Sequence, residues 1–91
     1  MILSYKHKSL KALMEEDKTK GILPHHLKRI KARLDRLDAI DNMDDLPSAL
    51  RCHPLHGDLE GFYAIDVSAQ WRIIFRFEDG NIFDVDYVQY H

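Results

Sequence analysis

The run Trp71-Arg72-Ile73-Ile74-Phe75-Arg76-Phe77-Glu78-Asp79-Gly80 decides the fold class of this chain. Its apolar residues mostly occupy every second position, so they form one face of a β-strand and leave the arginines on the other. Asp79-Gly80 then predicts a tight hairpin, because glycine accepts the positive φ that such a turn needs. An alternating run from residue 82 to about residue 88 supplies the returning strand. The stretch therefore predicts an antiparallel sheet in the second half of the sequence.

The first half of the sequence has a helical pattern instead. Apolar residues recur at helical spacing from about Pro24 to Ile40, and proline is tolerated in the first turn of a helix. A shorter helix, capped by Ser9 and ending near Asp17, is expected after a short strand within residues 2–7. The whole pattern predicts an α+β fold in which two N-terminal helices pack on one face of a four- to five-stranded, mostly antiparallel sheet.

The length and composition predict a single domain, residues 1–91, because a chain of 91 residues can bury one small hydrophobic core. No apolar run approaches the roughly 18 residues that a membrane-spanning helix needs, and no secretory leader is expected. Cys52 is the only cysteine, which excludes an intrachain disulfide and fits a reducing compartment. We therefore expect a cytoplasmic protein without contact with a membrane.

The net charge of −2 conceals an uneven distribution of charge along the chain. Residues 1–33 contain nine lysines and arginines and three acidic residues, whereas residues 34–91 contain four arginines and twelve acidic residues. A basic half can bind a polyanion such as nucleic acid, although composition alone favours an ordinary solvated helix surface. Four basic residues also lie early in the long helix, where the macrodipole disfavours cations, and hint at a partner. They are Lys28, Arg29, Lys31 and Arg33.

Histidine, arginine and tyrosine residues of the sheet half form the candidate site. Histidine titrates near neutral pH, so it can both remove and donate a proton. Cleavage of a phosphodiester by its own 2′-hydroxyl needs a base, an acid for the leaving 5′-oxygen and a cation against the charge on phosphorus. Two imidazoles, a tyrosine and an arginine supply these groups without a metal or another cofactor. We expect adjacent strands to bring together His53, His56, Arg72, Tyr90 and His91; the alternative is that they are ordinary surface groups.

Other reactive side chains are interpreted as structural. Cys52 and His53 are neighbours on a predicted strand and point to opposite faces, so they do not form a nucleophilic dyad. We expect Cys52 to be a small buried hydrophobic residue. His25 and His26 lie at a helix start without the further ligands that a metal site needs, and His7 is expected at the surface.

Several motifs of the sheet half occur in a fixed order. They are His53-Pro54-Leu55-His56-Gly57, Trp71-Arg72-Ile73 and Tyr90-His91. In this order they resemble the HigB toxins, which are RelE-like proteins of bacterial toxin–antitoxin pairs, and the resemblance covers essentially the whole chain. It implies a RelE-like fold and a ribosome-dependent endoribonuclease that cuts messenger RNA. It also implies a HigA-type antitoxin as partner, through which alone the protein would contact operator DNA.

The resemblance also implies roles for individual residues. His53, Tyr90 and His91 match the family's strand histidine and its terminal tyrosine and histidine, and Arg72 matches the arginine that faces the scissile phosphate. The residues further expected to contact RNA are His56, Arg76 and Gln89. The basic residues expected to dock on the ribosome are Lys28, Arg29, Lys31 and Arg33.

Two positions depart from the family pattern. Gln89 stands where the family usually has an aspartate, so a carboxylate that could orient an imidazole is missing. His56 stands where the family usually has a lysine, which makes attraction for phosphate dependent on pH. An alternative interpretation follows, in which the protein is a weakened toxin that mainly binds its antitoxin in transcriptional autoregulation. A toxin of the same fold aimed at another target, such as DNA gyrase, is a third interpretation, against which the Tyr90-His91 match counts.

Overall fold

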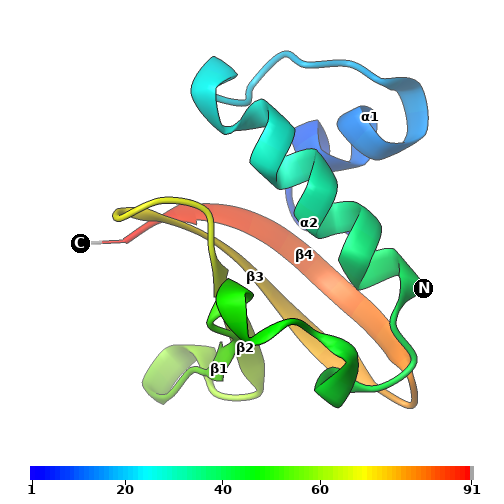
Figure 1. Ribbon diagram of the computed structural model, residues 1–91, viewed down its shortest axis with the longest axis vertical. Coiled ribbons are helices and arrows are strands. Elements are labelled where there is room, and N and C mark those ends of the chain that lie inside the picture. Colours follow the sequence, from blue (N-terminus) through cyan, green and yellow to red (C-terminus); the bar gives the residue numbers. More distant parts are fainter. Residues whose placement is uncertain (91) are drawn as a thin grey trace.

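The computed structural model describes residues 1–90 and contains two helices and four strands (Figure 1). The helices are α1 (Lys8–Glu16) and α2 (Leu27–Ala39), and a single 3-10 turn at Pro24–His26 leads into α2. The strands are β1 (His53–Pro54), β2 (Phe62–Asp66), β3 (Trp71–Glu78) and β4 (Asn81–Gln89). They form one antiparallel sheet in the order β1-β2-β3-β4. The predicted α+β class, with two helices and an antiparallel sheet of four strands, is confirmed.

One hydrophobic core joins both helices to the sheet. Burial of these apolar side chains removes them from water and supplies most of the free energy that stabilises a small domain. Figure 1 shows α1 and α2 on the same side of the sheet, with α2 running alongside β4. The core residues of the helices are Leu10, Leu13, Ile30, Leu34 and Leu37, and those of the strands include Ile65, Ile73, Phe75, Ile82 and Val85.

The predicted β-hairpin joins β3 to β4. Glu78 pairs with Asn81, so Asp79 and Gly80 are the two turn residues. Their φ angles are 49° and 81°, the left-handed conformation that a two-residue turn between twisted strands favours. Glycine has no Cβ to oppose this conformation, so the Asp79-Gly80 signal reported the turn correctly.

The segment before α1 does not form the expected strand. Ile2 and Tyr5 make only isolated parallel bridges, to Ile82 and Val85 of β4. The backbone bonds are nevertheless short, with 2.8 Å between Leu3 N and the carbonyl oxygen of Ile82. The segment therefore lies along β4, and the sheet itself has four strands and not five.

The helix boundaries differ slightly from the predicted ones. Ser9 does not cap α1; its N–H donates to Nδ1 of His7, 3.2 Å away, so His7 is the cap. An imidazole nitrogen can accept this bond because it has a lone pair when the ring is neutral. The long helix agrees with its prediction, since the turn at Pro24–His26 begins it and Ala39 ends it. None of the helices within residues 1–90 has both the length and the apolar character needed to cross a bilayer.

Candidate functional site

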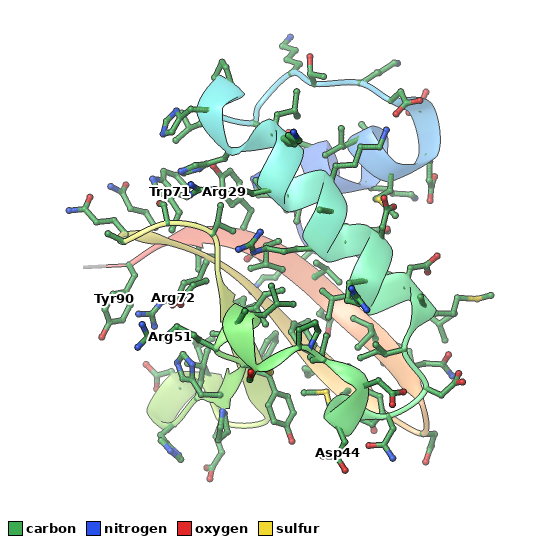
Figure 2. The ribbon with its side chains drawn as sticks, in the orientation of Figure 1. Arg29, Asp44, Arg51, Trp71, Arg72 and Tyr90 are labelled. Carbon is green, nitrogen blue, oxygen red and sulfur yellow. The ribbon has the colours of Figure 1, made fainter. Side chains whose placement is uncertain are left out.

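Arg72 and Tyr90 lie together on the face of the sheet that the helices leave uncovered. The Arg72 guanidinium carbon is 3.8 Å from the centre of the Tyr90 ring, a cation–π contact. Figure 2 shows Arg72, Tyr90 and Arg51 on one side of the sheet, with Trp71 and Arg29 on the other side, beside α2. Strand alternation explains this arrangement, because adjacent residues such as Trp71 and Arg72 point to opposite faces.

Asp66 on β2 links the arginines of this face. It pairs directly with Arg72 across the β2–β3 ladder, and its Oδ1 is 3.5 Å from Nε of Arg72. Its Oδ2 is 3.6 Å from Nε of Arg51. Both ion pairs are longer than the 2.7–2.9 Å of a strong charge-assisted hydrogen bond. Asp66 Oδ1 and Arg72 Nε are buried and have no hydrogen-bond partner among the described residues, so this ion pair is loosely made.

His53 begins β1 and is held by the backbone just before it. Its Nδ1 lies 3.0 Å from the carbonyl oxygen of Arg51. A carbonyl oxygen only accepts hydrogen bonds, so Nδ1 carries the proton and, in the neutral ring, Nε2 has the free lone pair. A histidine held in this tautomer is suited to remove a proton from a group that approaches Nε2.

The structure does not bring all the predicted site residues together. The sequence analysis expected the strands of His53 and Arg72 to be adjacent, and this is wrong. β2 lies between them and spaces the two strand backbones about 10 Å apart. His56 is exposed and starts the 3-10 turn Gly57–Leu59. Gln89 pairs with Trp71 and belongs to the opposite face from Tyr90. The expectations for His91 lie outside the described residues.

Arg76 lies on the same strand as Arg72 but is held by two acidic side chains. Its Nε donates to Asp84 and its Nη1 to Glu78, each at 2.9 Å. These bonds, the one to Asp84 first, raise the pKa of Arg76. Asp84 forms the bulge of β4 with φ of 55°, a strained angle for a residue with a Cβ, and Ser4 also bonds it. Arg76 thus holds this bulge in place.

The four basic residues of α2 divide into two kinds. Arg29 and Arg33 tie the helix to the end of β2, donating to the carbonyl oxygens of Val67, just after the strand, at 3.0 Å and of Asp66 at 2.6 Å. Lys31 is exposed and pairs with Asp17 at 2.6 Å, a bond that lowers the pKa of Asp17 and raises that of Lys31. Lys28 is also exposed. Arg29 and Arg33 therefore fix the helix on the sheet, although Arg29 is exposed like the two lysines.

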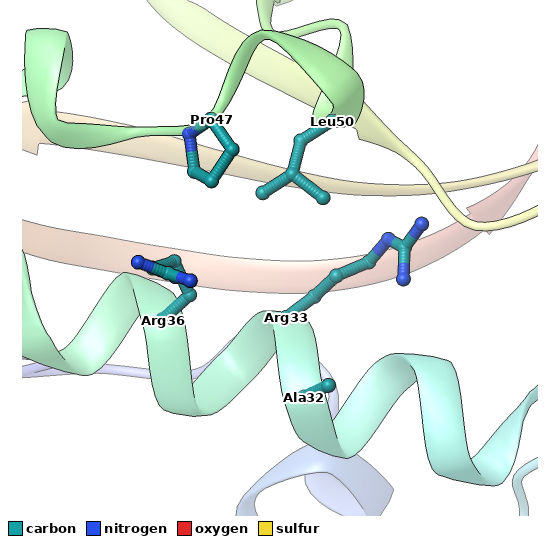
Figure 3. A pocket seen from close by; sticks show the side chains of 5 residues that line it. All are labelled: Ala32, Arg33, Arg36, Pro47 and Leu50. Carbon is teal, nitrogen blue, oxygen red and sulfur yellow. The ribbon is translucent and has the colours of Figure 1, made fainter.

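Two hollows of the described residues lie away from Arg72 and Tyr90. One of about 140 Å³ lies between α2 and the connection to β1, lined by Ala32, Arg33, Arg36, Pro47 and Leu50 (Figure 3). Another of about 320 Å³ lies beside α1 and includes Lys8, Lys18 and Lys20. Neither of these two hollows is lined by Arg72 or Tyr90. Within residues 1–90, no three or more His, Cys, Asp or Glu side chains are grouped to hold a metal ion.

A buried polar pair on the helix side was not expected from the sequence. His26 is 1% exposed, and its Nδ1 lies 2.6 Å from the Tyr87 hydroxyl. Trp71 packs on Tyr87 with ring centres 4.6 Å apart. Burial lowers the pKa of His26, and the neighbouring His25 and Arg29 lower it further. His26 therefore belongs to the core as a neutral ring, and its position at a helix start gave no sign of this.

The buried His26 predicts a loss of stability in acid. Its folded-state pKa is below the ordinary 6.5, so below about pH 6.5 the unfolded chain binds a proton that the folded chain resists. The free energy of unfolding should fall by up to about 1.4 kcal/mol per pH unit from this group as pH drops below 6.5. Urea unfolding at pH 7.5 and pH 5 measures the loss, which should shrink in His26→Gln and persist in His25→Gln. Equal pH dependence in both variants would contradict the assignment.

Cys52 is half-buried and packs against the hydrophobic core, as expected for a structural cysteine. Burial raises the pKa of its thiol, which disfavours the nucleophilic thiolate.

The residues that the sequence did not single out on the open face are Asp66 and Arg51. Two signals were present, since Asp66 ends a strand beside Arg72 and Arg51 precedes His53 by two residues.

Chemically, the open face offers a base, a cation and a hydroxyl. His53 presents a lone pair, Arg72 a cationic side chain that is only 20% exposed, and Tyr90 the hydroxyl of a residue that is 54% exposed. A cation partly shielded from water stabilises a nearby negative charge more strongly than one in bulk solvent. This set is suited to a phosphate ester, in which negative charge increases during cleavage.

Comparison with known proteins finds relatives that match nearly the whole sequence. The family of RelE-like toxins of the type II toxin–antitoxin system HigB matches residues 3–91. The Endoribonuclease HigB of Proteus vulgaris is 40% identical over 92 residues, which cover 100% of this chain and 100% of that protein. Toxin HigB-1 of Vibrio cholerae serotype O1 is 36% identical over 83 residues, 88% of this chain and 87% of that protein.

Solved structures show the same fold at low sequence identity. A single-residue variant of YafQ from E. coli superposes with a TM-score of 0.62 and 18% identity, covering 98% of this chain and 93% of that one. YoeB, in the heterotetrameric YoeB–YefM toxin–antitoxin complex from Staphylococcus aureus, gives a TM-score of 0.61 and 18% identity, covering 100% and 98%. The family match and the 40% identity over the full length show that this chain belongs to the HigB-like family of RelE-like toxins, as its motifs predicted.

Proposed function

We propose that this protein is the toxin of a type II pair and an endoribonuclease that cuts messenger RNA on the ribosome, without a metal. The observation that carries the proposal is the Arg72 guanidinium, which is mostly buried, stacked on Tyr90 at 3.8 Å and only loosely paired with Asp66. Full-length similarity to a protein named Endoribonuclease HigB supports the same reaction class.

In the proposed reaction, Nε2 of His53 removes the proton from a ribose 2′-hydroxyl. The 2′-oxygen then attacks the adjacent phosphorus, and the bond from phosphorus to the 5′-oxygen breaks. The products are a 2′,3′-cyclic phosphate and a free 5′-hydroxyl. The backbone bond from Nδ1 to Arg51 supports this role, because it leaves Nε2 as the basic nitrogen.

Arg72 faces the charge that builds on the phosphate oxygens, and Tyr90 or His91 protonates the leaving 5′-oxygen. The exposed ring of Tyr90 also offers a surface on which a base can stack. His56 and Gln89 are proposed to contact RNA outside the cleavage point. Arg76 is hydrogen-bonded to Asp84 and Glu78, so we do not include it among the proposed RNA-binding residues.

The proposed partners are a HigA-type antitoxin, the ribosome and messenger RNA, all met in the cytoplasm. YoeB, which shares the fold, has been solved with the antitoxin YefM, and this supports an antitoxin partner. For ribosome docking, the exposed Lys28 and Lys31 remain the proposed contacts. Arg29 and Arg33 contribute by holding α2 in place.

Induction of the protein without an antitoxin tests the proposal. Messages should be cut within translated regions, which primer extension detects as new 5′ ends, and growth should stop. Growth arrest without cut messages would contradict the nuclease assignment. Full toxicity after the double change Tyr90→Ala and His91→Ala would contradict the roles of these two residues.

A further inference from the structure

Three arginines from different parts of the chain meet at Asp66. Arg33 of α2 binds its backbone carbonyl at 2.6 Å, while Arg72 of β3 and Arg51 approach the two carboxylate oxygens at 3.5 and 3.6 Å. The first contact is a hydrogen bond that fixes the helix to the strand. The other two leave a single carboxylate between two guanidinium groups, so this spot has one positive charge in excess.

The lengths of these contacts show how firmly each cation is held. Arg76, on the same strand as Arg72, is held firmly by 2.9 Å hydrogen bonds to two carboxylates. Arg51 and Arg72 share one carboxylate at distances beyond a strong charge-assisted bond. A second anion with several oxygens can therefore bind both guanidinium groups, which have five N–H donors each.

The Arg51 side chain is free to leave Asp66 and bind such an anion. Its side chain is 79% exposed, so leaving Asp66 uncovers little buried charge. Its backbone has φ of 55°, an angle that a residue with a Cβ rarely adopts, and its carbonyl oxygen is the one that binds His53. The same backbone conformation therefore sets the direction of the Arg51 side chain and the tautomer of the candidate base. Figure 2 shows Arg51 and Arg72 on the same side of the sheet.

We propose that Arg51 is a second phosphate-binding residue of the site, and that Asp66 holds its guanidinium and that of Arg72 where the RNA phosphate will bind. Asp66 is a positioning residue, because it touches the two cations and not the substrate. When RNA binds, Arg51 exchanges the carboxylate for a phosphate oxygen, while the mostly buried Arg72 stays beside Asp66. This inference rests on the proposed function, since it names how that site binds its substrate.

The experiment separates binding from cleavage. Ribosomes programmed with a message carrying 2′-O-methyl groups in the codon at the decoding site cannot be cut, so they report binding alone across a series of salt concentrations. The unmodified message reports the single-turnover cleavage rate and the concentration of half-maximal rate. Arg51→Ala should weaken binding about 10- to 100-fold and reduce the salt dependence by roughly one ion, with a smaller effect on the maximal rate. Arg51→Lys should restore the salt dependence, because it keeps the charge.

Asp66→Asn gives a result of opposite sign. Removal of the competing carboxylate should tighten binding to the uncut message, while the maximal cleavage rate falls because Arg72 loses its anchor. Substitution of a residue with a purely structural role would instead weaken binding and also lower the maximal cleavage rate. Arg36→Ala is the matched control, since Arg36 is an exposed arginine of α2 beside the hollow of Figure 3.

Two outcomes would overturn the inference while the wild-type protein still cuts the message. One is that Arg51→Ala binds with wild-type affinity and salt dependence, and the other is that Asp66→Asn weakens binding. Absence of cutting by the wild-type protein would instead contradict the proposed function, so the two failures are distinguishable.

Discussion

Replacement of Arg72 by alanine is expected to slow message cleavage by about 10²–10³-fold, the usual effect of removing one group that stabilises transition-state charge. The guanidinium of Arg72 is mostly shielded from water, which strengthens its interaction with a phosphate. The substitution also removes the cation that packs on the Tyr90 ring at 3.8 Å, so the aromatic ring loses its support. The single-turnover rate on programmed ribosomes measures the effect.

Arg72→Lys provides the matched comparison. Lysine keeps the charge but not the planar fork that binds two oxygens and stacks on an aromatic ring, so an intermediate loss of about tenfold is expected. Asp66 keeps its other partner, Arg51, at 3.6 Å in both variants, so both should remain folded, and urea unfolding checks this. Wild-type cleavage by Arg72→Ala would remove this residue from the mechanism.

Replacement of Phe75 by alanine is expected to lower the free energy of unfolding by about 3–5 kcal/mol, since it leaves a cavity in the core. Phe75 is fully buried, and Tyr63 stacks on it with ring centres 6.0 Å apart. Domains of this size have a total stability of only about 5–15 kcal/mol, so this one change removes a large share. Urea unfolding followed by tryptophan fluorescence measures the loss, with Trp71 on the same strand as the probe.

Phe83→Ala is the control for this prediction. Phe83 is only partly buried, and the guanidinium carbon of Arg76 lies 5.7 Å from the centre of its ring. Its truncation should therefore lower the free energy of unfolding by about 1 kcal/mol. Equal losses for the two phenylalanines would mean that the core does not centre on β3. Phe75→Leu should cost less than Phe75→Ala, because leucine fills part of the cavity.

Local patterns were sufficient to predict most of the secondary structure. The helical spacing between Pro24 and Ile40 and the turn at Asp79-Gly80 depend on neighbouring residues, and both predictions agree with the structure. The short contact of residues 2–5 with β4 depends on partners far along the chain, and only its backbone bonds reveal it. Sequence periodicity contains no information on which strands are neighbours, so the separation of His53 from Arg72 by β2 was also missed.

The candidate site was predicted only in part for the same reason. Arg72 and Tyr90 were expected together and the structure places them in contact. Asp66 and Arg51 were missed because an acid and an arginine among many charged residues give no pattern until the strands are paired. The sequence shows only that His26 lies at a helix start. Its burial against Tyr87 depends on a contact between residues 61 positions apart, which no local pattern indicates.

The pairing of residues 2–5 with β4 bears on the order in which the newly made chain can act. Ser4 and Asp84, which bond to each other, are 80 positions apart in sequence. Contacts of this separation form late, because a long loop must close before they contribute. During synthesis the backbone of residues 2–5 has no strand to pair with until β4 has been made, and β4 leads directly into Tyr90. The pairing of residues 2–5 with β4 can therefore form only after the ribosome has synthesised nearly all of the described chain.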